Sequence, residues 1–116
     1  MRLCHLDDLP DGASRGFDPR GTGRDTLFVV RRGTALRAYL NACPHHGTPM
    51  AWRKDAYLDA AGERIVCFAH GAQFEIDSGA CTLGPCLGQS LTPLPLIQHD
   101  DGEVHLAAPS FEETQP

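Results

Sequence analysis

The fold of this 116-residue chain is decided by two short stretches, Cys43-Pro44-His45-His46-Gly47 and Cys67-Phe68-Ala69-His70-Gly71. Each stretch offers one thiol and one imidazole, and each closes on a glycine that lets the backbone turn tightly around a bound object. If the two loops stand side by side, two thiolates and two imidazoles converge on one site. The candidate metal ligands are Cys43, His45, Cys67 and His70.

Three kinds of metal centre can be compared with this donor set. Tetrahedral zinc accepts two cysteines and two histidines, but its sites usually group Cys with Cys and His with His along the chain. Copper would need a methionine or a three-ligand set, for which Met50 alone is weak support. One mixed pair per loop suits a binuclear iron–sulfur centre in which one iron takes both thiolates and the other both imidazoles. The pattern therefore favours a 2Fe-2S cluster over zinc.

The motif C-x-H-x-G followed by C-x-x-H-G resembles the signature of the Rieske iron–sulfur family. The resemblance continues through Gln73-Phe74-Glu75-Ile76 and Ser78-Gly79, which look like the strand and turn after the second ligand loop. Leu83-Gly84-Pro85-Cys86 is similar to the Gly-Pro loop that covers the cluster in that fold. The resemblance spans about residues 26–106, and it implies a single Rieske-type domain over residues 1–116 with a frayed tail at 109–116.

The resemblance also implies how the cluster is held and used. Cys43 and Cys67 would bind the inner iron, and His45 and His70 would bind the outer iron, where the electron sits after reduction. The expected function is one-electron transfer without catalysis, from a flavin- and NADH-dependent reductase to a Rieske ring-hydroxylating dioxygenase. Two alternatives stay open: the small subunit of an assimilatory nitrite reductase, and a zinc-stabilised interaction module with no redox role.

Four positions depart from the respiratory members of the family. Those proteins brace the cluster with a disulfide between the two loops, where this chain has Thr48 and Ala69. They also use a serine and a tyrosine hydroxyl to hydrogen-bond the cluster sulfurs, where this chain has Ala72 and Phe74. Losing these hydrogen bonds lowers the potential, because they stabilise the extra negative charge of the reduced cluster. We therefore expect the low end of the Rieske range, roughly −150 mV.

Hydrophobic periodicity predicts an all-β fold of short antiparallel strands. Leu36, Ala38 and Leu40 alternate with more polar neighbours, as a half-buried strand requires, so Tyr39 is expected on the polar face. Together with the β-formers before Arg32-Gly33, this pattern predicts a hairpin over residues 26–41. The prolines at 93 and 95 indicate a sheet edge or a loop. Further strands are expected at 64–68, 72–77, 96–99 and 103–106.

Charge, apolar runs and the N-terminal sequence limit which binding partners and which cell compartment are expected. Ten basic and fifteen acidic residues give a formal charge of −5, which argues against a nucleic-acid partner. The longest apolar run, Leu27-Phe28-Val29-Val30, is too short to span a membrane. The N-terminus shows no export signal, so a cytoplasmic location is expected.

The remaining cysteines and histidines have simpler expected roles. Five cysteines without an export signal suit metal ligands and inert thiols better than a disulfide scaffold. Cys81 and Cys86 are expected as packed thiols beneath the covering loop, with a disulfide as the alternative. Cys4 is expected as a small buried hydrophobe in a first strand, and His5 as an ordinary surface residue.

Overall fold

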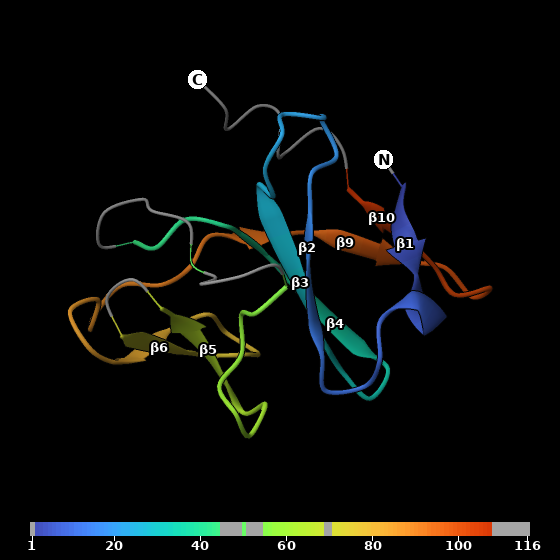
Figure 1. Ribbon diagram of the computed structural model, residues 1–116. Helices are drawn as coiled ribbons and strands as arrows, with labels where there is room; N and C mark the ends of the chain where they lie inside the picture. The colour runs from blue at the N-terminus through green and yellow to red at the C-terminus, as the bar shows by residue number, and fades with distance from the viewer. Residues whose placement is uncertain (1, 45–49, 51–54, 69–70, 108–116) are drawn as a thin grey trace.

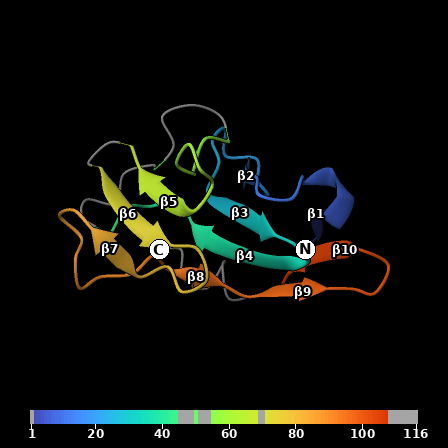
Figure 2. The same ribbon diagram turned by 90° about the horizontal axis from the view of Figure 1, so that it is seen from below.

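The computed structural model describes residues 2–44, 50, 55–68 and 71–107, which form antiparallel sheets and one turn of 3-10 helix (Figure 1). A four-stranded sheet lies between two three-stranded sheets. The two three-stranded sheets lie at opposite ends of the molecule in both ribbon views (Figure 2). The expected all-β fold is therefore confirmed.

The strands are short, as the high glycine and proline content indicates. The middle sheet contains β2 (Ser14–Phe17), β3 (Leu27–Arg32), β4 (Ala35–Leu40) and β8 (Pro93–Leu94). One end contains β5 (Arg64–Cys67), β6 (Ala72–Glu75) and β7 (Cys81–Leu83). The other end contains β1 (Arg2–His5), β9 (Leu96–Gln98) and β10 (Glu103–Leu106).

The predicted hairpin over 26–41 is confirmed as β3 and β4. Its register runs from Leu27 opposite Leu40 to Arg32 opposite Ala35. Gly33 in the connecting turn has φ 63°, a conformation that glycine adopts without steric cost. The short strand β8, which begins at Pro93, lies at the edge of this sheet, where proline does not remove a ladder hydrogen bond.

Strand β3 separates two hydrophobic cores, because its alternating side chains enter different ones. Phe28 and Val30 belong to the site core, and Leu27 and Val29 belong to the second core. The site core consists of Phe28, Val30, Tyr39, Cys43, Met50, Tyr57, Ile65, Cys67, Ala72, Phe74, Ile76, Cys81, Cys86 and Leu91. The second core consists of Cys4, Leu9, Phe17, Leu27, Val29, Leu36, Ala38, Leu94, Val104 and Leu106.

The expectation that β4 is only half buried is wrong at Tyr39. Leu36 and Ala38 fill the second core as predicted, but Tyr39 on the opposite face is 1% exposed and packs in the site core. Its hydroxyl donates to the carbonyl of Ile76 at 2.6 Å, so the buried phenol is satisfied. The β5-β6-β7 end packs on that face of β4, and period-two alternation alone does not reveal such a second layer.

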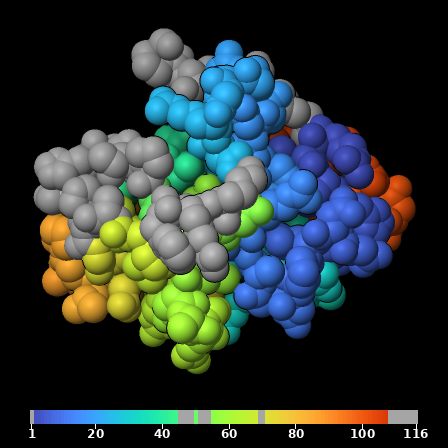
Figure 3. All heavy atoms as spheres, in the orientation of Figure 1, coloured from blue at the N-terminus to red at the C-terminus, as the bar shows by residue number. Residues whose placement is uncertain are grey.

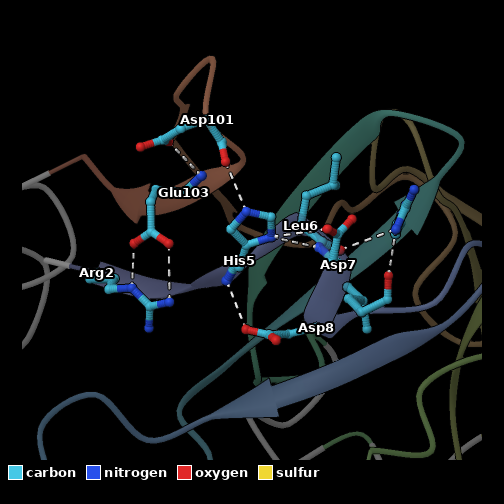
Figure 4. A network of polar contacts seen from close by, with 9 residues as sticks. Arg2, His5, Leu6, Asp7, Asp8, Asp101 and Glu103 are labelled. Carbon is cyan, nitrogen blue, oxygen red and sulfur yellow. Dashed lines mark hydrogen bonds and ion pairs between the residues drawn. The ribbon is translucent and has the colours of Figure 1, made fainter.

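Polar contacts join β1 to the hairpin of β9 and β10 (Figure 4). Arg2 on β1 donates two hydrogen bonds to the Glu103 carboxylate on β10. His5 accepts the Asp7 N–H through Nδ1 at 3.0 Å and contacts the Asp101 carbonyl through Nε2 at 2.8 Å. His5 lies at the surface as expected, and it also caps the 3-10 turn Leu6–Asp8, a role that was not predicted. Cys4 is buried in this strand as expected.

Candidate metal centre

The first candidate ligand loop starts directly after β4 and is fixed by Asn41. The Asn41 side chain accepts the backbone N–H of Met50 at 2.9 Å and donates to the carbonyl of Asp25 at 2.9 Å. One side chain therefore ties the start of the loop to its end and to the segment before β3. Cys43 lies within this loop and is completely buried. The sequence reasoning missed Asn41, whose only signal is an amide directly after an apolar strand.

The second candidate loop follows β5, whose last residue is Cys67. The backbone N–H of Gly71 donates to the Cys67 carbonyl at 2.7 Å, and Gly71 has φ 74°, so the predicted tight turn is present. The N–H of Phe68 donates to the carbonyl of Met50 at 2.9 Å. This bond places the second loop beside the end of the first, as the convergence of two ligand pairs requires.

A third loop follows β7 and packs against the start of β6. Gly84 has φ 101°, and a Cβ placed on it would lie 2.8 Å from the Cα of Ala72, so glycine permits this close approach. Turn bonds from Leu87 N–H to the Gly84 carbonyl and from Gln89 N–H to the Cys86 carbonyl close the loop. Within it, Cys86 is completely buried. This is the segment that the sequence predicts as the covering Gly-Pro loop.

Three buried sulfur atoms therefore come from three separate segments, namely two loops and the last residue of β5. The Sγ atoms of Cys43 and Cys86 lie 3.7 Å apart, and Cys67 belongs to the same core. None of the five cysteines forms a disulfide, so the expected thiols at Cys81 and Cys86 are confirmed against the alternative. Of the four predicted ligands, His45 and His70 lie outside the described residues, as do Thr48 and Ala69.

The surroundings of Cys43 and Cys67 are apolar. No charged side chain is buried among the described residues, and the site core contains only hydrophobic side chains, thiols and two tyrosines. Burial raises the pKa of Tyr39 and Tyr57 above the ordinary tyrosine value, so both phenols are neutral. Soft sulfur donors among buried apolar side chains suit iron–sulfur chemistry, which needs thiolates.

The model of the Rieske [2Fe-2S] domain matches residues 1–108 of the chain. The chain belongs to the Rieske [2Fe-2S] family. A relative at 33% identity over 92 residues is the cytochrome b6-f complex iron-sulfur subunit of Chlorobaculum thiosulfatiphilum. The match covers 79% of this chain and 42% of that protein, so the chain spans less than half of the relative's length.

Solved structures of dioxygenase ferredoxins share the fold. The ferredoxin of carbazole 1,9a-dioxygenase from Nocardioides aromaticivorans IC177 is 28% identical with a TM-score of 0.71, over 92% of this chain and 95% of that one. A chain in the complex of reduced oxygenase and oxidized ferredoxin in carbazole 1,9a-dioxygenase is 26% identical with a TM-score of 0.71, over 92% and 100%. The protein is therefore a ferredoxin-like Rieske electron carrier with one 2Fe-2S cluster, which decides against the zinc alternative.

Among the described residues, no helix has the length and apolar character that a bilayer crossing needs.

Proposed function

We propose that Cys43 and Cys67 bind one iron of the cluster and that His45 and His70 bind the other. The two cysteines are buried, are not in disulfides and are carried by loops that a backbone hydrogen bond joins. The two histidines follow these cysteines at the spacing of the family motif. The thiolates would anchor the inner iron within the site core, and the imidazoles would hold the iron that exchanges the electron.

The proposed role is that of a freely diffusing ferredoxin, within a single domain over residues 1–116, which takes electrons from a flavin-dependent reductase and delivers them to a Rieske ring-hydroxylating oxygenase. The likeness to dioxygenase ferredoxins covers nearly the whole of both chains, and one such relative is solved with its oxygenase. The positions of the respiratory disulfide hold Thr48 and Ala69, which favours this role over that of the cytochrome complex subunit. We place the protein in the cytoplasm, where reductases supplied by NADH work.

The surroundings of the proposed ligands support a low potential. Ala72 and Phe74 begin β6 immediately after the second loop, are completely buried and offer no hydroxyl. Reduction adds one negative charge, and an apolar environment disfavours added charge. The proposed midpoint therefore lies near the low end of the Rieske range, at roughly −150 mV.

Exposed apolar side chains near these loops form the proposed docking surface for the oxygenase. Phe68 follows Cys67 and is 38% exposed, while Leu83 and Leu87 flank the covering loop and are 55% and 64% exposed. Large exposed apolar side chains beside a functional loop are candidates for a protein–protein contact. The β5-β6-β7 end that carries them (yellow to orange) lies on the opposite side from β1 and β10 (Figure 3).

An electron-transfer assay with purified components tests this function. NADH and a flavin-dependent ferredoxin reductase should bleach the visible absorption of the oxidised protein, and an oxidised Rieske oxygenase should restore it. No reduction by such a reductase, or no reoxidation by the oxygenase, would contradict the proposed role. Purification from native extract in a stable complex with a large haem-containing subunit would instead favour the nitrite reductase alternative.

A further inference from the structure

Cys86 is a buried thiol that the expected ligand set does not use. Its Sγ lies 3.7 Å from the Sγ of Cys43, within the range of a sulfur hydrogen bond, and both side chains are completely buried. The two residues are 43 positions apart in the chain and lie in different loops. Their contact is therefore a product of how the covering loop packs on the first ligand loop.

We propose that Cys86 is a positioning residue that donates its S–H to the Cys43 sulfur and raises the potential of the cluster. The proposal rests on the proposed role of Cys43 as an iron ligand. A cysteine that binds iron does so as a thiolate, which accepts hydrogen bonds and has no proton to donate. The proton in the contact between the two sulfurs then belongs to Cys86.

The direction of the effect follows from charge. The electron that enters the cluster increases negative charge on its sulfur ligands, and a donor aimed at such a sulfur stabilises the reduced form more than the oxidised form. The apolar site core strengthens the interaction, because a low local dielectric screens it weakly. Ala72 and Phe74 supply no side-chain donor there, which increases the relative weight of the thiol.

The covering loop holds Cys86 in place from both sides. The N–H of Gln89 donates to the Cys86 carbonyl at 2.8 Å, and the close approach of Gly84 to Ala72 fixes the other side of the turn. This anchoring preorganises the donor, so little reorganisation is needed when the cluster is reduced.

Cys81 provides a matched control within the same core. It is also a buried thiol, at 8% exposure, but its Sγ donates to the carbonyl of Leu83 at 3.3 Å. The substitutions Cys86→Ala and Cys81→Ala remove the same atoms from the same core. Only the first removes the donor that faces Cys43.

The test compares midpoint potentials of the cluster-loaded variants. Cys86→Ala should make reduction less favourable, several-fold and at most about tenfold in the equilibrium constant, which is ~59 mV for one electron. Cys81→Ala should leave the midpoint unchanged. A Cys86→Ala protein with the wild-type midpoint, or an equal shift in Cys81→Ala, would overturn the proposal.

Infrared difference spectra of the wild-type and Cys81→Ala proteins give a second test that does not need the Cys86→Ala variant to fold. The S–H stretch lies in a spectral window that other protein groups leave nearly empty, and a stronger hydrogen bond moves it to lower frequency. An S–H band that is still present in Cys81→Ala should shift to lower frequency when the cluster is reduced. If no S–H band shifts between the oxidised and the reduced protein, the proposal is overturned. Failure of the ligand assignment is separate, because a four-thiolate paramagnetic signal would reveal it in the wild-type protein.

Discussion

Two buried positions in β6 are expected to set how many hydrogen bonds the reduced cluster receives. Ala72 and Phe74 are completely buried, and neither carries a hydrogen-bond donor. Restoring hydroxyls with Ala72→Ser and Phe74→Tyr should raise the midpoint potential. A hydrogen bond to a charged group contributes ~1.5 kcal/mol, close to a tenfold change in the reduction equilibrium, or about 59 mV for one electron.

Protein-film electrochemistry measures this shift directly. Ala38→Ser provides the control, because Ala38 is also buried, at 3% exposure, but belongs to the second core. The control should lose some stability and keep its midpoint. If both hydroxyl variants load the cluster without raising the midpoint, missing hydroxyls do not explain a low potential.

Residue types and spacing are the part of the site that the sequence predicts well. Two mixed Cys and His pairs, each closed by a glycine, indicate the cluster because coordination chemistry restricts which ligands can serve. The contact of Cys86 with Cys43 and the brace at Asn41 could not be predicted in this way. Both depend on how separate segments of the chain pack together, and the only local sign of either is the amide of Asn41 directly after an apolar strand.

The covering loop packs against the start of β6 by a close backbone approach that only glycine allows. Gly84 and Gly88 both have positive φ, at 101° and 89°, but only a Cβ at Gly84 would meet the backbone of Ala72. Gly88→Ala should cost about 1–2 kcal/mol of stability from backbone strain alone. Gly84→Ala should cost a further ~1–3 kcal/mol, because the loop has to move away.

Chemical unfolding of the two variants measures this difference, and the loss of visible absorption with time reports on cluster retention. Gly84→Ala should release its cluster faster than Gly88→Ala does. Equal stability and equal retention in the two variants would show that the loop does not need its contact with β6.

Turn residues and hydrophobic alternation predict most of the strands. The remaining strands depend on pairing between segments that are far apart in the chain. The β3–β4 hairpin follows from its turn residues and pattern, and so do the strands β5, β6, β9 and β10. The pairing of β1 with β10 joins the two ends of the described chain, and it explains why His5 has partners. Burial of Tyr39 has the same kind of cause, since a second layer covers the face that alternation marks as polar.

The ion pair across β1 and β10 predicts a pH dependence. The hydrogen bond from Arg2 lowers the pKa of Glu103 in the folded protein. The pair therefore stabilises the fold above the ordinary glutamate pKa of about 4.3, and this contribution is lost as the pH falls through the lowered folded pKa. The effect is small, because both side chains are exposed to solvent.

Thermal unfolding of wild-type and Arg2→Gln proteins across acid pH checks this sign. The variant should melt slightly lower at neutral pH, and the two curves should converge in acid. A difference between the two proteins that grows toward low pH would contradict the assignment.

The two ends of the molecule are expected to differ in function. The β5-β6-β7 end carries the proposed ligands and exposes Leu87, whereas the β1-β10-β9 end joins the termini of the described chain and exposes Ile97. Leu87→Lys should slow electron transfer to the oxygenase about tenfold or more, because it places a charge in an apolar contact. Ile97→Lys adds the same charge at the other end and should leave the rate unchanged.

Stopped-flow reoxidation of the reduced protein by the oxygenase gives these rates, and the midpoint of each variant is measured alongside. Both midpoints should stay at the wild-type value, so that a slower rate reports docking. Equal rates in the two variants, or slowing only in Ile97→Lys, would place the interface elsewhere.

We propose that two thiolates hold one iron of the cluster and that two imidazoles hold the other. Electron paramagnetic resonance of the dithionite-reduced protein distinguishes this ligation from ligation by four thiolates. Mixed ligation predicts a rhombic signal whose average g-value lies below that of all-thiolate 2Fe-2S ferredoxins. A silent sample, or the signal of four-thiolate ligation, would contradict it.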